Sequence, residues 1–296
     1  MDGAVDHRHT WTVVLGGALE PEGSWPGDIS SPLSQTLDLA MSISDARRVV
    51  VPLPAREPWA ALPGGPSHPV LDQGRVLREP SDRGTACSLF LALCLVQAVD
   101  PEALIVVLPA DHFVHPAHAL GIRVTAALDT ARRIDRTVVL GVAPTSLEAR
   151  HGWILPGSPV ARVSQLEVRR VETFIERPSH DLAALIRDTG GLWSTMMLAA
   201  PLERLWASGL RSLPELLTPL DPFPAVAGTP LERPWLDATY ARLPRRSIAS
   251  DFLHRLGEEL AVAELNEVSW CDWESSRRIL DVLHDLGGRP ENIGAP

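Results

Sequence analysis

Leu104-Ile-Val-Val-Leu-Pro-Ala-Asp-His112 is the stretch of this chain that decides the fold. Its first five residues form an apolar, β-branched run with the length of a buried strand. Runs of the same kind occupy residues 11–17, 48–53 and 137–142, and helical patterns occupy residues 88–99 and 122–134. Strands that alternate with helices predict an α/β fold: a Rossmann-like, mainly parallel sheet flanked by helices.

Polar residues and glycines follow these strands, and ligands bind beyond the carboxyl ends of parallel strands. Asp111 is the next-to-last residue of the quoted stretch and follows the strand, where its carboxylate is available to a hard cation such as Mg²⁺. The alternative is a turn residue or a helix cap. Gly16 and Gly17 follow the first strand and would let a phosphate approach backbone N–H groups.

A third candidate segment is Glu79-Pro-Ser-Asp-Arg-Gly-Thr-Ala86, which precedes the apolar helix. Arg83 offers a planar donor fork, and Gly84 and Thr85 offer backbone groups to a base or a phosphate. The alternative is a surface loop in which Arg83 pairs with Glu79.

The pattern changes after about Pro144. Residues 165–176 alternate like a half-exposed strand, and residues 191–198 give another strand, which together predict an antiparallel insertion facing the first half. The proline-rich segment 213–234 is expected to be an extended connection with little regular structure. Two helices, at residues 250–260 and 274–286, are expected to close the chain.

We therefore expect one domain over residues 11–286. Its nucleotide-binding half covers 11–144, and its sugar-binding half with the closing helices covers 145–286. Residues 1–10 and 287–296 are expected to be tails. The net charge of −10 disfavours a nucleic-acid partner. No run of 18 apolar residues occurs, so we expect neither a membrane span nor export. We expect a cytoplasmic location instead. Three cysteines without a CxxC pair are expected to be reduced and buried.

Six short motifs, taken in order, resemble the mannose-1-phosphate guanylyltransferase branch of the sugar-1-phosphate nucleotidyltransferases. They are Glu79-Pro80 with Arg83-Gly-Thr-Ala86, Pro109-Ala-Asp-His112, His151-Gly-Trp-Ile154, Phe174-Ile-Glu-Arg-Pro178, Gly190-Gly-Leu-Trp-Ser-Thr195 and Ser269-Trp-Cys-Asp-Trp273. The resemblance covers residues 11 to about 286. It implies the fold of the nucleotide-diphospho-sugar transferases, with an antiparallel sugar-side insertion.

The activity that the resemblance implies is Mg²⁺-assisted transfer of a nucleotide from GTP to a hexose 1-phosphate, releasing pyrophosphate. Asp111 and Asp272 match the metal-holding carboxylates, and Arg177 matches the cation that clamps the sugar phosphate. The segment that recognises the nucleotide is matched by Gly16, Gly17, Glu79, Arg83, Gly84 and Thr85. The region around the sugar is matched by Gly152, Glu176, Trp193 and Thr195, while Arg177 stands at the family's lysine position and Ser194 at its asparagine position. A homo-oligomer or a pathway partner is left open.

The phosphate loop departs from the family pattern Gly-Gly-x-Gly-Ser/Thr-Arg-Leu-x-Pro. After Gly17 the chain reads Ala18-Leu-Glu-Pro-Glu-Gly-Ser-Trp-Pro26, without the arginine and with two added acidic residues. Leu33 stands where the family has a lysine, and all 27 basic residues of the chain are arginine. The alternative function is therefore a weakly active or inactive relative that binds a nucleotide or sugar nucleotide and regulates a partner.

Overall fold

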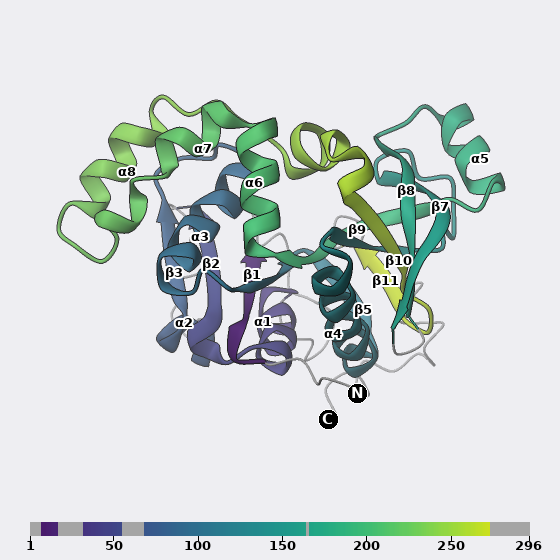
Figure 1. The fold of residues 1–296 in the computed structure, drawn as a ribbon, viewed down its shortest axis with the longest axis horizontal. Helices are drawn as coiled ribbons and strands as arrows, with labels where there is room; N and C mark the ends of the chain where they lie inside the picture. The colour runs from purple at the N-terminus through teal and green to yellow at the C-terminus, as the bar shows by residue number, and fades with distance from the viewer. Residues whose placement is uncertain (1–6, 17–31, 55–67, 164–165, 273–296) are drawn as a thin grey trace, which may run out of the picture.

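The computed structural model describes residues 7–16, 32–54, 68–163 and 166–272. Its centre is a sheet of nine strands among these residues, in the order β3-β2-β1-β4-β9-β6-β10-β8-β7 (Figure 1). Four neighbours run parallel: β1 (Thr10–Leu15), β2 (Val49–Pro54), β3 (Arg75–Glu79) and β4 (Leu104–Pro109). A second parallel pair is β6 (Thr137–Val142) with β10 (Leu260–Glu264).

The remaining strands are antiparallel to their neighbours. Strand β9 (Leu192–Pro201) lies between β4 and β6, and β8 (Leu166–Glu176) and β7 (Gly152–Val163) complete the far end of the sheet. A separate two-stranded sheet pairs β5 (His112–His115) with β11 (Ser269–Asp272). Together these pairings join both halves of the described chain into one framework.

Helices cover both faces of the large sheet, because strand residues alternate between two apolar clusters. Val13 and Ile105 belong to the cluster that contains α3, whereas Val14 and Val106 belong to the cluster that contains α4. The α-helices are α1 (Pro32–Ile43), α2 (Pro69–Gln73), α3 (Thr85–Val99), α4 (Ala117–Ile134), α5 (His180–Asp188), α6 (Leu202–Ser212), α7 (Pro214–Leu220) and α8 (Glu232–Tyr240). Short 3₁₀ turns are η1 (His7–His9), η2 (Ala46–Arg48) and η4 (Phe223–Ala225).

The α/β prediction is confirmed, including the strands at 11–17, 48–53, 104–108 and 137–142 and the helices at 88–99 and 122–134. Helix α3 is buried nearly all round, as its apolar composition predicts. The three cysteines, Cys87, Cys94 and Cys271, are free and buried, as expected.

Two element predictions are wrong. The segment 213–234 is not an extended connection: it holds α7, η4 and the start of α8, because Leu216, Leu217 and Leu220 of α7 pack into the same core as α3. Pro214 stands at the first turn of α7, where a missing N–H costs nothing, and Pro219 lies inside the helix near its end.

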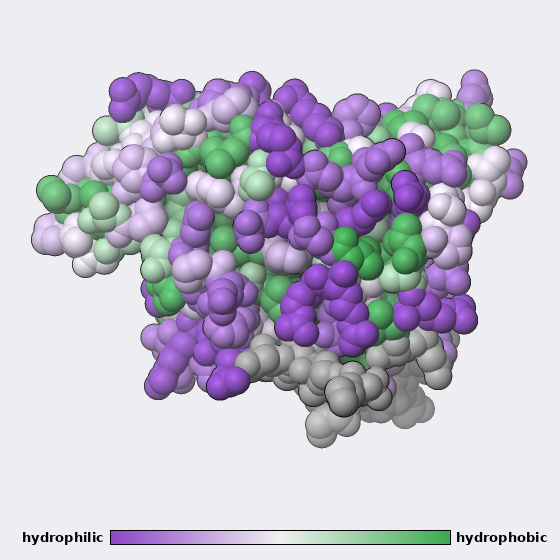
Figure 2. All heavy atoms as spheres, in the orientation of Figure 1, coloured by the Kyte–Doolittle hydropathy of each residue, from purple (hydrophilic) through white to green (hydrophobic). Residues whose placement is uncertain are grey.

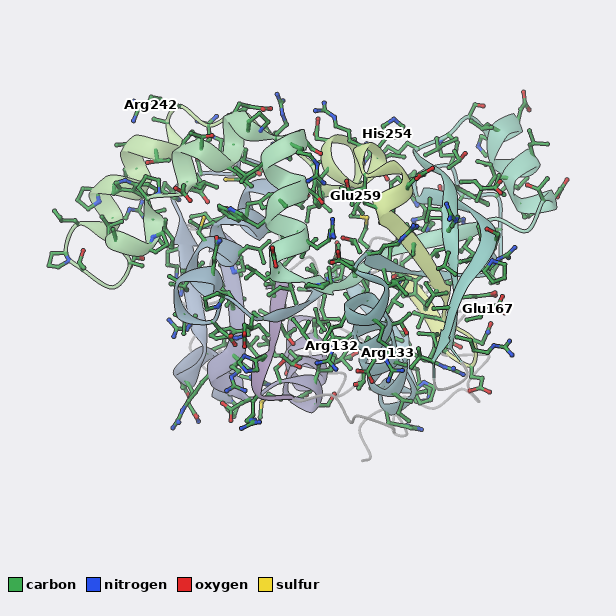
Figure 3. All side chains as sticks on the ribbon, in the orientation of Figure 1. Arg132, Arg133, Glu167, Arg242, His254 and Glu259 are labelled. Carbon is green, nitrogen blue, oxygen red and sulfur yellow. The ribbon has the colours of Figure 1, made fainter. Side chains whose placement is uncertain are left out.

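The expected helix at 250–260 is also wrong. The chain there forms a π-turn η5 (Ile248–Phe252), two 3₁₀ turns, η6 (Leu253–Arg255) and η7 (Gly257–Glu259), and then strand β10. Its side chains fasten it to its neighbours, since Glu259 accepts hydrogen bonds from Ser208 and Arg211 of α6, and His254 Nδ1 lies 2.8 Å from the Phe174 carbonyl (Figure 3). The predicted helix 274–286 lies outside the described residues.

The surface in Figure 2 is mostly hydrophilic, with apolar side chains spread among polar ones. Exposed apolar side chains such as Ile122 on α4, Leu185 on α5 and Leu231 before α8 belong to different elements. Among the helices that the structure describes, none is both long and apolar enough to cross a membrane.

Candidate functional site

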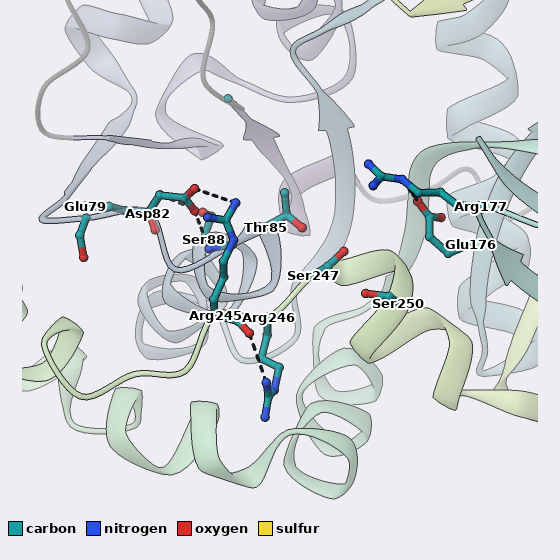
Figure 4. Close-up of a pocket in the computed structure, with 13 residues that line it drawn as sticks. Glu79, Asp82, Thr85, Ser88, Glu176, Arg177, Arg245, Arg246, Ser247 and Ser250 are labelled. Atoms are coloured by element: carbon teal, nitrogen blue, oxygen red, sulfur yellow. Dashed lines mark hydrogen bonds and ion pairs between the residues drawn. The ribbon is translucent and has the colours of Figure 1, made fainter. Parts of the chain in front are cut away.

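A pocket of about 530 Å³ opens between the carboxyl ends of the parallel strands and the end of β8. Its lining residues come from four separate segments: Gly16, Glu79, Ser81, Asp82, Gly84, Thr85, Ser88, Glu176, Arg177, Arg245, Arg246, Ser247 and Ser250. In Figure 4, Glu176 and Arg177 stand on one side of this pocket, and Asp82, Thr85 and Arg245 stand on the other. The pocket therefore lies where ligands bind in an open α/β sheet.

Glu79 is the buried carboxylate of the pocket. It ends β3 and is only 4% exposed, and it accepts hydrogen bonds from Tyr240 Oη and Ser88 Oγ, both at 2.8 Å. Burial raises the pKa of Glu79, and the two hydroxyl groups partly oppose that rise. Because both oxygens are engaged by protein hydroxyls, Glu79 ties α3 and α8 to the edge of the sheet.

Gly84 and Thr85 begin α3 and are fastened to the segment that follows α8. Gly84 has φ +84° and ψ 162°, a region that only glycine adopts readily, and an ideal Cβ there would lie 2.2 Å from the Arg246 carbonyl oxygen. Thr85 Oγ1 accepts the backbone N–H of Ile248 at 3.0 Å. The close approach of two backbones requires a glycine at position 84.

Glu176 and Arg177 form the opposite wall. Arg177 has φ +51°, a left-handed conformation that turns the chain at the end of β8. Glu176 Oε2 is buried without a hydrogen-bond partner among the described residues, and burial raises the pKa of the carboxyl while the Arg177 charge lowers it. An ideal Cβ at Gly152 would lie 2.8 Å from that oxygen, so the glycine leaves room for the carboxylate.

The small sheet brings the backbone of Asp272 close to that of Asp111. Asp272 pairs with His112, the residue after Asp111, in the β11–β5 register, although the two aspartates are far apart in sequence. Asp111 also lies next to Gly16, because the Ala110 N–H donates to the Leu15 carbonyl at 3.0 Å. Neither aspartate lines the pocket itself. Gly16 lines the pocket and lies close to the segment of Asp111, so it connects the pocket with the aspartates.

The aspartates suit a hard cation only together with other ligands. Asp111 is 46% exposed at its side chain and Asp272 is 12% exposed. No group of three or more His, Cys, Asp or Glu side chains within the described ranges could hold a metal ion by itself. Mg²⁺ usually takes one or two carboxylates and completes its coordination with substrate phosphates and waters, so two aspartates would suffice as its protein ligands.

Aromatic rings pack behind the aspartates. His151 lies edge-on to Trp193 at 4.9 Å and to Trp270 at 5.4 Å between ring centroids, and its Nδ1 is 3.8 Å from Asp272 Oδ2. Trp153 extends the stack, 6.0 Å from Trp193. This rigid support fixes the backbone from which Asp272 projects.

Besides the two aspartates, five predicted site residues do not line the pocket: Arg83, Gly152, Trp193, Ser194 and Thr195. Arg83 does not line the pocket, and its Nη2 donates to the Ala241 carbonyl at 3.5 Å. Trp193, Ser194 and Thr195 are buried in β9, where Thr195 Oγ1 donates to the Leu140 carbonyl at 2.7 Å. Of the two predicted glycines after β1, Gly16 lines the pocket and Gly17 lies outside the described residues.

Sequence reasoning missed half of the pocket wall. The missed residues are Ser81, Asp82, Ser88, Arg245, Arg246, Ser247 and Ser250. Position in sequence offered a signal for Ser81 and Asp82, which lie within the candidate segment 79–86, and for Ser88, which follows it. The pair Arg245-Arg246 offered only its local charge, because its place beside Gly84 depends on α7 and α8, which the sequence reading did not predict.

Part of the chain is similar in sequence to known proteins. Residues 72–213 match the family described as nucleotidyl transferase. The chain is 30% identical over 132 residues to a mannose-1-phosphate guanylyltransferase of Escherichia coli, covering 44% of this chain and 28% of that protein. It is 27% identical over 224 residues to the xanthan biosynthesis protein XanB of Xanthomonas campestris pv. campestris (strain B100), covering 72% of this chain and 44% of that protein. The chain thus spans less than half the length of these curated relatives.

Solved structures share the fold. A structure from Thermus thermophilus, described as mannose-1-phosphate geranyltransferase, superimposes with a TM-score of 0.76 at 25% identity, over 93% of this chain and 79% of that one. A UDP-glucose pyrophosphorylase complexed with UDP-glucose superimposes with a TM-score of 0.54 at 11% identity, which shows the fold alone. The large, mainly parallel sheet flanked by helices is therefore of the nucleotide-diphospho-sugar transferase type.

Proposed function

Because residues 72–213 belong to the nucleotidyl transferase family, we propose that the chain joins a nucleotide to a sugar 1-phosphate. The finer proposal is GTP and mannose 1-phosphate as substrates and GDP-mannose as product, and the similarity to proteins described as mannose-1-phosphate guanylyltransferase supports it. In this reaction a sugar-phosphate oxygen attacks the α-phosphorus of the triphosphate. The bond to the β-phosphate oxygen breaks, and pyrophosphate leaves.

One observation carries the proposal: the β11–β5 register pairs Asp272 with His112, the residue after Asp111, and the Ala110–Leu15 hydrogen bond brings this segment close to Gly16 at the rim of the pocket. Such a carboxylate pair would hold Mg²⁺ together with nucleotide phosphates. When bound, the ion would neutralise negative charge on the phosphates. The support for Asp272 by His151 and the tryptophans would keep that carboxylate in a fixed place.

The opposite wall has the chemistry for the sugar phosphate. Arg177 is 77% exposed at its side chain, carries a permanent charge and faces the pocket, so it would bind the phosphate group. Glu176 Oε2, buried without a donor among the described residues, would accept a sugar hydroxyl. Two walls of different chemistry would set the reacting groups against each other, which is the main contribution of the protein in phosphoryl transfer.

A second candidate function follows from the first loop. Residues 9–46 contain no arginine and no lysine, and Glu20 and Glu22 add negative charge where the family pattern has an arginine. A chain of this kind would bind a nucleotide or sugar nucleotide and regulate a partner, with little turnover. The pocket residues serve both functions, so only a measurement of product separates them.

The experiment measures pyrophosphate release and nucleotide-sugar formation from GTP and mannose 1-phosphate with Mg²⁺, with other sugar 1-phosphates and nucleotides in parallel. We expect Asp111→Asn and Asp272→Asn each to lower kcat/KM at least roughly a hundredfold. Asp237→Asn, on the surface of α8, is the matched control and should retain activity. Absence of product for every substrate pair, with GTP still raising the Tm, would reject the enzyme and support the binding protein.

A further inference from the structure

Arg245 is a cation at the pocket that the proposed function leaves without a role. Its Nη2 lies 2.9 Å from Asp82 Oδ2, and both residues line the pocket (Figure 4). The side chains are 72% and 57% exposed, respectively. An ion pair that is this exposed contributes little to stability, because water and salt screen it. Asp82 therefore holds Arg245 only weakly.

The backbone around Arg245 is fixed, although its side chain is exposed. The Arg246 N–H donates to the Arg83 carbonyl at 2.9 Å, and the Arg246 carbonyl accepts the Ala86 N–H at 3.1 Å. The Ile248 N–H donates to Thr85 Oγ1 at 3.0 Å. These three hydrogen bonds fasten the segment to the first turn of α3, so Arg245 projects from an ordered backbone at the nucleotide side of the pocket.

The other two arginines that line the pocket have different partners or lie on a different wall. Arg246 binds Glu215 of α7 at 3.0 Å, and in Figure 4 its side chain points away from Asp82 and Thr85. Arg177 stands on the opposite wall beside Glu176. Among the described residues that line the pocket, Arg245 is thus the arginine that faces the ligand space from the wall of Gly84 and Thr85.

The polyphosphate of a nucleoside triphosphate needs positive charge on the wall of Gly84 and Thr85, and the sequence after β1 does not provide that charge. Residues 9–46 lack arginine and lysine entirely. We propose that Arg245 binds the polyphosphate of the nucleotide and that Asp82 competes with the ligand for it. A guanidinium can grip phosphate oxygens bidentately, and a polyphosphate carries more negative charge than one carboxylate. The assignment rests on the proposed use of this pocket for a nucleotide.

Replacement of Asp82 should change the affinity for polyphosphate in a direction that the proposal predicts. Its Oδ1 accepts the Gly84 N–H at 2.7 Å, which shapes the turn before α3. In Asp82→Asn the amide oxygen keeps this hydrogen bond, whereas the charge that holds Arg245 is removed. The variant should therefore bind polyphosphate more tightly, and a merely structural ion pair would give the opposite sign or no change.

The experiment measures the Kd of inorganic tripolyphosphate and of GTP by calorimetry, with the full chain at fixed ionic strength. Arg245→Gln should weaken tripolyphosphate binding about tenfold, the size expected from losing a hydrogen-bonded charge. Asp82→Asn should tighten it by roughly threefold or more, and the gain should vanish in the double variant. Arg233→Gln and Asp237→Asn, which form an exposed pair within α8, are the matched controls and should change neither Kd.

Tripolyphosphate has neither base nor sugar, so this test is independent of turnover. A chain that makes no product but binds tripolyphosphate through Arg245 rejects the enzyme and keeps the assignment. If the wild-type chain does not bind tripolyphosphate, or if Arg245→Gln binds it as well as Arg233→Gln does, the assignment is wrong even in an active enzyme. A loss of mannose 1-phosphate affinity alone would also overturn it, because Arg245 would then serve the sugar phosphate.

Discussion

Replacement of Tyr240 by phenylalanine removes one of the two hydroxyls that hold the pocket residue Glu79 and leaves the ring in place. Tyr240 is fully buried, and its Oη donates to Glu79 Oε1 at 2.8 Å. Ser88 donates to the other oxygen at the same distance. Glu79 therefore keeps one hydroxyl partner in Tyr240→Phe and loses the other.

The expected loss follows from the charge of the acceptor. A hydrogen bond to a charged group contributes about 1.5–3 kcal/mol. Since the ring still packs in the α3 core, we expect the free energy of unfolding to fall by about 2 kcal/mol at pH 7. Burial raises the pKa of Glu79 and the Tyr240 bond lowers it, so the variant should raise that pKa further. Below about pH 4.3 Glu79 is protonated in both states, and the loss should shrink.

The assay is urea unfolding of the full chain between pH 4 and pH 8, followed by tryptophan fluorescence and by circular dichroism. The nine tryptophans give the first probe, and coincidence of the two transitions tests two-state behaviour. Thr130→Val is the control, because Thr130 is buried and donates to a neutral acceptor, the Ala126 carbonyl, at 2.7 Å. Its loss should be about 1 kcal/mol and independent of pH.

Two results would refute the reasoning. The first is a Tyr240→Phe loss at pH 7 no larger than that of Thr130→Val. The second is a Tyr240→Phe loss that stays constant from pH 4 to pH 8. Either result would mean that the charge on Glu79 is not what Tyr240 stabilises.

Three further variants address the same pocket. Glu79→Gln should remove a pH dependence: a carboxyl whose pKa is raised on folding contributes fully below its ordinary pKa and loses that contribution as the pH rises, so the stability of wild type relative to Glu79→Gln should fall from about pH 4.3 upward in urea titrations. Gly84→Ala should lower the free energy of unfolding by about 1–3 kcal/mol and shift the backbone at Arg246, as measured by denaturation and hydrogen exchange. Gly152→Ala should displace Glu176, costing about 1 kcal/mol or less but raising the KM for mannose 1-phosphate.

The glycine variants have internal controls. Gly190 also has φ +84°, but no heavy atom lies within 4 Å of its ideal Cβ, so Gly190→Ala should cost less than Gly84→Ala. Equal losses would mean that the Arg246 carbonyl does not restrict position 84. For Gly152→Ala, an unchanged KM would show that Glu176 does not contact the sugar. A Glu79→Gln profile parallel to wild type would contradict the inferred pKa of Glu79.

Local sequence patterns predicted an element correctly where its apolar composition alone requires burial. The four apolar runs became β1, β2, β4 and β6, because a β-branched run of this length has few ways to be buried other than as a central strand. Helix α3 followed from an apolar surface on every side. In contrast, β10 was not predicted, since it has only five residues and their burial depends on β6 and β8.

The site divides in the same way. Single motifs pointed to Asp111, Glu176 and Arg177, because each directly follows or ends a strand that the sequence makes recognisable. The approach of Asp272 to this segment was not visible from spacing, because only the β11–β5 register pairs Asp272 with His112, the residue after Asp111. Trp193, Ser194 and Thr195 carried polar groups suited to a ligand, yet they are buried in β9, where Trp193 and Ser194 pair with β6 and Trp193 also pairs with β7.

The sequence by itself determined the class of fold, the absence of lysine and the loss of basic residues from the first loop, because these depend on residue type and local order alone. The tertiary structure alone decided that Arg245 stands beside Asp82 and faces Arg177 across the pocket. That arrangement needs α7 and α8 to pack on α3 and return the chain to Gly84. Contacts between residues more than 150 positions apart are set by the packing of whole elements, and no local pattern in the chain encodes them.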